Sequence, residues 1–254
     1  DYLIADQTII PEQSQKHYSE KIVYLPSFQA NDSKQSQSVT SFNRKDIGLP
    51  EKGFVFCCFN NTYKITPVIL DSWAQILKNV EGSVLLIFAS NESAKIHLTK
   101  EITLRGVDPS RLILGEYLAR PDYLGRYQIA DLFLDTHPYN AGTTSSDALR
   151  MGLPVLTRLG NSFASRMGSS ILNAVNLPEL ITSSQEEYEK LAIKLATNPE
   201  QFKLIKDKLA NNLPSAPLFD TPLFTKHLEV AYRRMYERFH DGLKPDHIYV
   251  EHSS

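Results

Sequence analysis

One stretch in the middle of the chain, residues 130–157, constrains the fold more than any other. Its short apolar run at 132–134 is typical of a buried strand, and a loop rich in turn-forming residues follows. Two threonines, Thr143 and Thr144, then stand where a helix begins, and residues 155–156 start the next strand. Strand, polar loop, helix N-terminus and strand make up the βαβ unit that binds phosphate groups in open parallel sheets. We therefore expect this loop to bind a diphosphate.

The same alternation of strand and helix extends over most of the chain. Short apolar runs are separated by stretches with helical character, each of roughly 10 to 15 residues. We expect strands at 54–58, 84–89, 112–114, 132–134, 155–156 and 179–181, and helices at 66–77, 91–106, 121–128, 144–152 and 162–175. From about residue 184 we expect a helical region with a break around Pro214 and Pro217, followed by a long helix at 221–240. This order predicts an α/β fold with a Rossmann-like, doubly wound parallel sheet and a long C-terminal helix.

The first 45 residues form a lead-in that makes no convincing domain by itself. Two strand-like segments, 2–5 and 22–25, flank a polar segment, and residues 29–38 have the composition of a linker. The chain starts at Asp1 without Met, directly before a plausible strand. We therefore expect a piece of a longer protein, divided into residues 1–45 and residues 46–254.

Charge and composition argue against several classes of function. The chain has 27 Lys and Arg against 29 Asp and Glu, and the net charge of −2 gives no support for nucleic acid or an anionic membrane as partner. The longest apolar run, at 84–89, is too short to span a bilayer, and no signal peptide is visible. The only two cysteines, Cys57 and Cys58, are neighbours, which fits a reducing, cytoplasmic location. No cluster of His, Cys and acidic residues has metal-ligand spacing, so we predict no metal site.

Thr143 and Thr144 have two competing interpretations. At a helix start, the unpaired N–H groups and the helix dipole attract an anion, and the two hydroxyls add hydrogen-bond donors. Alternatively, Thr144 and Asp147 form a capping box that only stabilises the helix. The sequence leaves both open, because a capped helix can still present Thr143 to a ligand.

Five other residues near the predicted strand ends are candidates for nucleotide or sugar binding. Lys64 lies just before a predicted helix, where its charge opposes the helix dipole unless an anion is bound. Asp147 can accept hydrogen bonds from ribose hydroxyls. Arg120 and Tyr123 can stack on a base, and His137 can reach a sugar. These residues also have purely structural interpretations. Lys64 can be an exposed surface lysine, and Asp147 can be part of a helix cap. Tyr123 can pack its helix, and His137 can be a structural histidine.

Several segments resemble the signature of the O-GlcNAc transferase and SPINDLY glycosyltransferase family. They are residues 135–157, 58–65, 164–166 and 242–247, together with 1–7 and 18–21 near the N-terminus. The resemblance implies a GT-B enzyme with two Rossmann-like lobes and a nucleotide-sugar cleft between them. On this basis, residues 46–254 are the C-terminal, donor-binding lobe with its C-terminal helices. Residues 1–45 are the tail of the N-terminal catalytic lobe and a linker.

The resemblance also implies roles for individual residues. Lys64 would be the catalytic residue that holds the diphosphate and stabilises the leaving UDP. Asn61 would lie near the phosphate or the sugar. Thr143 and Thr144 would bind the phosphates through backbone and hydroxyl groups, and Asp147 would hold the ribose.

Arg120 matches a family lysine near the nucleoside, but two other positions depart from the family pattern. Tyr123 stands where many members have a histidine that stacks on uracil, and a tyrosine can still stack there. Gly142 stands where many members have a histidine before the Thr pair, so a possible sugar contact is absent. SPINDLY-type members, which use GDP-fucose, resemble this chain at 138–139 and 142–144.

The function we predict is inverting transfer of GlcNAc from UDP-GlcNAc to Ser and Thr hydroxyls of proteins, without a metal or other cofactor. The alternative enzyme is a SPINDLY-like protein O-fucosyltransferase that uses GDP-fucose. The alternative from another class is a non-catalytic peptide-binding or scaffold protein. The expected partners are the UDP-GlcNAc donor, acceptor proteins, the N-terminal catalytic lobe and upstream tetratricopeptide repeats. Without that lobe, we expect residues 1–254 to bind the donor weakly and to transfer little.

Overall fold

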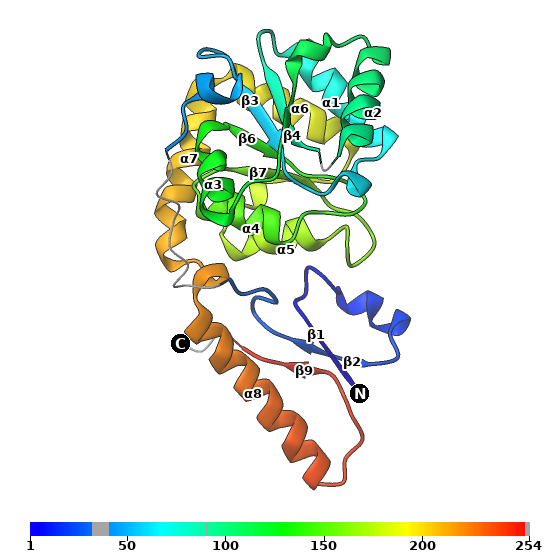
Figure 1. Cartoon of the computed structure of the whole chain (residues 1–254). Coiled ribbons are helices and arrows are strands. Elements are labelled where there is room, and N and C mark those ends of the chain that lie inside the picture. The colour runs from blue at the N-terminus through cyan, green and yellow to red at the C-terminus, as the bar shows by residue number, and fades with distance from the viewer. Residues whose placement is uncertain (32–40, 90, 252–254) are drawn as a thin grey trace.

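The computed structural model describes residues 1–31, 41–89 and 91–251, so residues 32–38 of the predicted linker lie outside the described part. Its main feature is a parallel sheet of six strands in the order β5-β4-β3-β6-β7-β8, flanked by helices (Figure 1). This arrangement confirms the predicted α/β fold with a doubly wound parallel sheet. The strands are β3 (Val55–Cys58), β4 (Val84–Phe88), β5 (Leu112–Gly115), β6 (Leu132–Leu134), β7 (Val155–Arg158) and β8 (Ile181–Thr182).

The two central strands, β3 and β6, are buried along their whole length. Parallel strands that helices cover on both faces have continuous apolar sequences, which is why the apolar runs locate them well. Aromatic side chains fill the space between the sheet and its helices. The largest fully buried ones are Trp73, Tyr127, Tyr188, Phe56 and Phe133.

The helices α1 (Pro67–Asn79) and α2 (Glu92–Leu104) begin at the caps that the sequence predicts. The side chains of Thr66 and Asn91 each accept a hydrogen bond from the backbone N–H three residues further on, at 3.4 and 2.8 Å. Proline at the first position of α1 loses no intrahelical hydrogen bond there.

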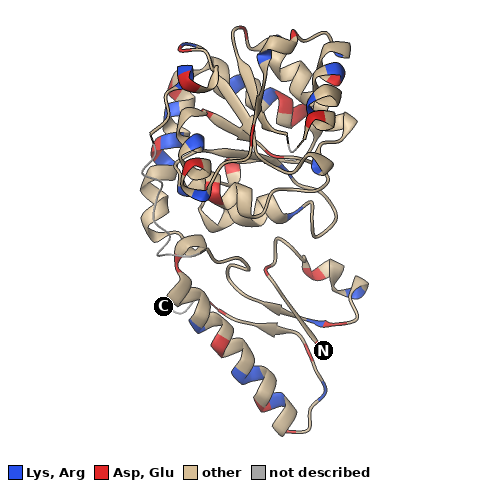
Figure 2. Ribbon diagram, viewed as in Figure 1, with Lys and Arg blue, Asp and Glu red and all other residues tan. Residues whose placement is uncertain are grey.

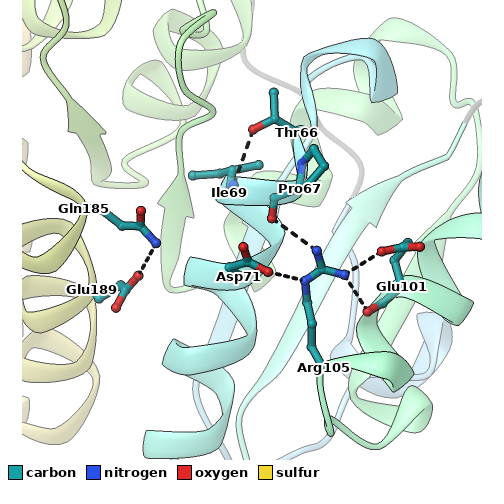
Figure 3. Close-up of polar contacts among 8 residues, drawn as sticks. All are labelled: Thr66, Pro67, Ile69, Asp71, Glu101, Arg105, Gln185 and Glu189. Atoms are coloured by element: carbon teal, nitrogen blue, oxygen red, sulfur yellow. Dashed lines mark hydrogen bonds and ion pairs between the residues drawn. The ribbon is translucent and has the colours of Figure 1, made fainter.

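Arg105 joins these two helices after the end of α2 (Figure 3). Its guanidinium donates to Asp71 Oδ1 of α1 and to Glu101 Oε2 of α2, each at 2.6 Å. It also donates to the main-chain oxygen of Pro67 at 3.4 Å. Arg105 thereby fixes the first turn of α1 against α2, and this turn follows the segment that carries Lys64.

The other helices follow the predicted order, with two local differences. They are α3 (Arg120–Gly125), α4 (Thr143–Arg150), α5 (Met167–Ala174), α6 (Gln185–Thr197), α7 (Pro199–Asn212) and α8 (Thr221–His240). Helix α5 begins five residues later than the predicted 162, because Ser162 and Ser165 hydrogen-bond each other in a tight turn before it. Strand β8 begins only after a turn of 3-10 helix at Pro178–Leu180, where the sequence suggests strand.

A second, smaller parallel sheet is formed by both ends of the chain. Its order is β1 (Tyr2–Ala5), β2 (Lys21–Tyr24) and β9 (Ile248–Tyr249). Helix α8 runs alongside this sheet (Figure 1), and its Ala231 is buried against Val23 and Ile248. The pairing of β9 with β2 was not predicted, and the division into 1–45 and 46–254 stays a prediction.

Charges of both signs alternate along α8 and do not form one basic stripe (Figure 2). The most exposed large apolar side chains of this helix are aromatic, namely Tyr232, Tyr236 and Phe239. Within the described ranges, no helix combines the length and the apolar character needed to cross a bilayer.

We expect Tyr188→Phe to lower the free energy of unfolding by about 1–3 kcal/mol. The buried Tyr188 hydroxyl accepts a hydrogen bond from Trp73 Nε1 at 3.2 Å and donates one to the main-chain oxygen of Asp135 at 3.0 Å. Its removal leaves one donor and one acceptor buried without a partner. Urea unfolding measures the change, and Tyr232→Phe on exposed α8 is the control. An equal effect of both variants would contradict this account.

Candidate functional site

A crevice is expected where the strand order of the large sheet reverses, between β3 and β6. From β3 the chain proceeds to β4 and β5 on one side, and from β6 it proceeds to β7 and β8 on the other. The loops after β3 and β6 therefore diverge, and ligands of open parallel sheets bind between such loops. The loop at 59–66 carries Asn61 and Lys64, and the loop at 135–142 leads into Thr143.

Hydrogen bonds connect the two loops at the base of this crevice. Thr66 Oγ1 donates to the main-chain oxygen of His137 at 3.3 Å. Asn60 Nδ2 donates to Thr136 Oγ1 at 2.7 Å, and Asn60 Oδ1 accepts from Thr144 Oγ1 in the first turn of α4. The relative position of the loops is thus fixed by buried and half-buried side chains.

Helix α4 presents an uncapped N-terminus to the crevice, which corrects the capping-box interpretation. No side chain caps this helix. The hydroxyl of Thr144 bonds to Asn60, and the carboxylate of Asp147 pairs with Arg120. The N–H groups of the first turn precede the first intrahelical donor, Ser146 N, which bonds to Gly142 O at 3.1 Å. With Thr143 exposed beside them, these N–H groups suit an anion.

Lys64 comes from the opposite loop and faces the segment that leads into Thr143. Its Nζ donates to Asn140 O at 3.0 Å and lies 3.9 Å from the centre of the Tyr139 ring. Asn61 is exposed at the start of the same turn, and its side chain accepts from Tyr63 N at 3.4 Å. The structure therefore brings Lys64 to the loop that leads into α4, whereas Asn61 lies exposed in its own loop at 59–66.

Arg120, Tyr123 and Asp147 form a connected group on the other side of α4. Asp147 is almost fully buried, and its two carboxylate oxygens accept from the Arg120 guanidinium at 2.7 Å each. This bidentate ion pair raises the pKa of Arg120 through its hydrogen bond. Tyr123 bonds to the Tyr127 hydroxyl, which donates to Thr144 O at 3.2 Å. The predicted nucleoside residues therefore contact the first turn of α4 through Tyr127.

A pocket of about 270 Å³ opens next to this group. Its walls are aromatic and cationic, as a base-binding pocket requires. A larger hollow of about 640 Å³ lies beside α5 and the small sheet and is lined by none of the predicted site residues. The residues that line the smaller pocket are Phe59, Phe88, Tyr117, Leu118, Arg120, Tyr123 and Arg126.

His137 and Gly142 lie in the loop between β6 and α4. The His137 side chain is half-buried, and burial, together with the charge of Arg158, lowers its pKa. A neutral imidazole is therefore expected at neutral pH. A side chain at Gly142 would meet Gln29 and Met167 only at ordinary contact distances, so packing does not require glycine there.

Three residues of this region were not predicted from the sequence. Asn60 joins the two loops, as described above. Asp135 lies fully buried directly after β6, and burial raises its pKa to about 7 against the opposing effect of hydrogen bonds from Thr157, Ala141, Thr136 and Asn60. Each of these two polar residues follows a buried apolar strand, which was the signal available in the sequence.

Arg126 is the third missed residue, and it is a buried cation in the wall of the pocket. It is 3% exposed, lies 4.0 Å from the centre of the Phe59 ring, and donates to Glu116 O at 3.0 Å. Burial lowers its pKa. None of the carboxylates in the described residues lies within ion-pair distance of it, and its Nε has no partner there. A cation in such a position can bind a carbonyl oxygen of a ligand.

The described ranges contain no group of three or more His, Cys, Asp or Glu residues that could hold a metal ion. Whether the chemistry needs a metal stays a prediction.

Residues 27–228 match the model of glycosyl transferase family 41. The chain is 35% identical over 98% of its length to a probable UDP-N-acetylglucosamine–peptide N-acetylglucosaminyltransferase, SEC, of Arabidopsis thaliana. It is 31% identical over 96% of its length to a probable enzyme of the same description, SPINDLY, of Petunia hybrida. It spans about a quarter of the length of these relatives, 26% in each case.

Solved structures agree with the fold. A mutant of the O-GlcNAc transferase of Thermobaculum terrenum superposes with a TM-score of 0.83 at 34% identity, over 93% of this chain and 45% of that one. A sucrose-phosphate synthase of Thermosynechococcus elongatus superposes with a TM-score of 0.65 at 14% identity, over 93% of this chain and 59% of that one, which supports the fold alone. The expected GT-B type of fold and the family resemblance are thereby confirmed.

We expect the carboxyl group of Asp135 to make stability depend on pH. Its folded-state pKa of about 7 exceeds the ordinary 3.8, so the folded protein holds this proton more tightly than the unfolded chain. Its contribution to the free energy of unfolding therefore falls as pH rises from about 4 to 7, by at most about 1.4 kcal/mol per pH unit. Urea unfolding of the wild type and of Asp135→Asn between pH 5 and 8 measures this contribution. Parallel stability curves for the two proteins would contradict it.

Proposed function

The chain belongs to glycosyl transferase family 41, and from that premise we propose that it is the donor-binding part of a protein O-GlcNAc transferase. The donor would be UDP-GlcNAc and the acceptors Ser and Thr hydroxyls of proteins. The observation that carries this proposal is the contact of Lys64 with the loop that leads into the uncapped N-terminus of α4, at the point where the strand order reverses between β3 and β6. A dianionic diphosphate fits between these positive groups.

In the transfer that we propose, the acceptor oxygen bonds to the anomeric carbon while the bond from that carbon to the diphosphate breaks. Negative charge then grows on the departing diphosphate. The Lys64 ammonium and the first N–H groups of α4 stabilise this charge without a metal ion. Attack from the face opposite the diphosphate inverts the anomeric centre. The acceptor proton passes to a base outside this chain, in the N-terminal catalytic lobe.

The nucleoside would occupy the region between the pocket and α4. The base would stack on Tyr123, and the buried Arg126 would donate to one of its carbonyl oxygens. The ribose would contact the ion pair of Arg120 and Asp147. Uracil and guanine both offer a carbonyl oxygen, so the pocket suits UDP and leaves GDP-fucose as the second candidate donor. The second candidate rests on the resemblance of residues 138–139 and 142–144 to SPINDLY-type members.

The remaining partners follow from the length of the relatives. Because this chain covers about a quarter of them, we propose that a further catalytic lobe and tetratricopeptide repeats act with it. The acceptor groove would lie between this chain and that lobe. Residues 1–254 alone would then bind the donor weakly and transfer little sugar. A cytoplasmic location is part of the same proposal.

We expect Lys64→Ala to lower sugar transfer by the complete protein about 10²- to 10³-fold, as the loss of one charge-stabilising donor typically does. Transfer from UDP-GlcNAc to a Ser/Thr peptide is measured by mass spectrometry. Lys100→Ala, which removes an exposed lysine from α2, is the matched control and should leave the rate unchanged. Near-normal transfer by the Lys64 variant would count decisively against the proposed role.

Calorimetric titration with UDP and with GDP separates the donor candidates. We expect UDP to bind more tightly than GDP, and we expect Tyr123→Ala to weaken that binding because the stacking surface is lost. A preference for GDP would replace the GlcNAc proposal by the fucosyl alternative. Binding of neither nucleotide would favour a non-catalytic scaffold.

A further inference from the structure

Asp135 occupies a position in the large sheet that stability alone does not explain. It lies directly after β6, at the carboxyl edge of the sheet, and its side chain is buried with 1% of the residue exposed. Among the described residues, no cation lies within ion-pair distance of it. An isolated buried carboxylate is costly unless hydrogen bonds compensate for the lost hydration.

Four donors surround this carboxylate. Oδ1 accepts from Thr136 N at 2.8 Å, from Ala141 N at 2.7 Å and from Asn60 Nδ2 at 3.3 Å. Oδ2 accepts from Thr157 Oγ1 at 2.6 Å. Three of these distances are short, as is typical of bonds to an ionised acceptor. The arrangement therefore suits the carboxylate form, which accepts at both oxygens.

The neighbouring helix leaves room for this arrangement. A Cβ atom at Gly168 in α5 would lie 2.6 Å from Asp135 Oδ2 and 2.4 Å from Thr157 Oγ1. Both distances are far below contact, so only glycine lets α5 approach the carboxylate this closely. The titratable groups that face Asp135 from other elements are the Cys58 thiol of β3 and the Tyr188 hydroxyl of α6.

The hydrogen bonds to Asp135 reach both ends of the loop that leads to α4. Thr136 is the second residue of this loop, and Ala141 is the last but one. Asn60 extends the connection, because its other amide atom accepts from Thr144 in the first turn of α4. One buried carboxylate thus sets the path of the loop that carries the partner of Lys64, Asn140 O.

We propose that Asp135 is a positioning residue, whose carboxylate holds the loop at 136–142 and the first turn of α4 in the shape that binds the donor diphosphate. This inference rests on the proposed function. Asp135 has no exposed surface toward the crevice and acts only through the loop. Its removal should therefore weaken donor binding more than it slows the chemical step.

The test compares three variants of the complete protein. Asp135→Ala removes both acceptor oxygens, and Asp135→Asn keeps one of them without the charge. Asp131→Asn is the matched control, because Asp131 lies just before the opposite end of β6 and accepts hydrogen bonds from Arg44 and from Val55 N. The measurements are KM and kcat for UDP-GlcNAc, and hydrogen exchange at the amides of residues 136 and 141.

We expect Asp135→Ala to raise KM at least about tenfold, because bonds to a charged acceptor are strong, with a smaller change in kcat. The two loop amides should exchange at least about tenfold faster. Asp135→Asn should restore only part of both properties, because its amide keeps one acceptor oxygen without the charge and places a donor where the other oxygen accepts, and the control should change neither. Equal KM and equal exchange in the alanine variant and the wild type would overturn the proposal.

A pH profile of UDP-GlcNAc binding keeps the proposal testable if the alanine variant does not fold. Both phosphates of this donor are esterified, so the donor itself does not titrate near neutrality. Affinity of the wild type should fall as pH drops below about 7, where Asp135 takes up a proton, and affinity of Asp135→Asn should not. Identical profiles would overturn this inference alone. No binding of UDP-GlcNAc by the wild type would overturn the proposed function as well.

Discussion

The adjacency of β3 and β6 in the middle of the sheet is the constraint on which the site depends. These strands are neighbours in space, yet 73 residues separate the end of β3 at Cys58 from the start of β6 at residue 132. The described residues of that span form two strands and three α-helices. After β3 the chain turns toward one edge of the sheet, and after β6 it turns toward the other edge. A crevice between the two loops is expected from this topology. Residues 60 and 64 on one side, and 135 to 144 on the other, meet there because of that topology.

Burying polar groups at this crevice costs folding free energy, which the burial of the surrounding apolar core offsets. Asp135 and Arg126 are both nearly inaccessible to solvent, and each lacks a partner of opposite charge among the described residues. Hydrogen bonds and aromatic contacts compensate only part of their hydration. Strands β3 and β6 themselves are apolar along their length, so both charged groups lie outside them, one directly after β6 and one in the wall of the pocket. Buried charged groups with shifted pKa values are more typical of a binding site than of a core built for stability alone.

Helices and strands were predicted well from the sequence, whereas the partners of individual side chains were predicted poorly. Helix α8 has the predicted bounds, because Asp220, Pro222 and Gly242 mark them locally. The capping box at Thr144 failed because Asn60, 84 residues away, takes the threonine hydroxyl. The pairing of β9 with β2 was missed for a different reason, because a two-residue strand has almost no local sequence pattern. Local signals predict where helices begin, whereas partners brought together by the fold decide what each polar side chain does.

Helix α5 shows how the small sheet is connected to the site. On one side, Gly168 packs against the Asp135 carboxylate. On the other, Arg166 Nη1 donates to Thr8 O at 3.1 Å, and Ser170 bonds to the carboxylate of Asp6. Asp6 and Thr8 directly follow β1, so the small sheet and the loop before α4 contact opposite sides of one short helix. These hydrogen bonds connect the segment after β1 to the helix whose Gly168 packs against the Asp135 carboxylate, although a hollow of about 640 Å³ separates other parts of α5 and the small sheet. The position of α5, and with it the packing around Asp135, therefore depends on contacts with the segment that follows β1.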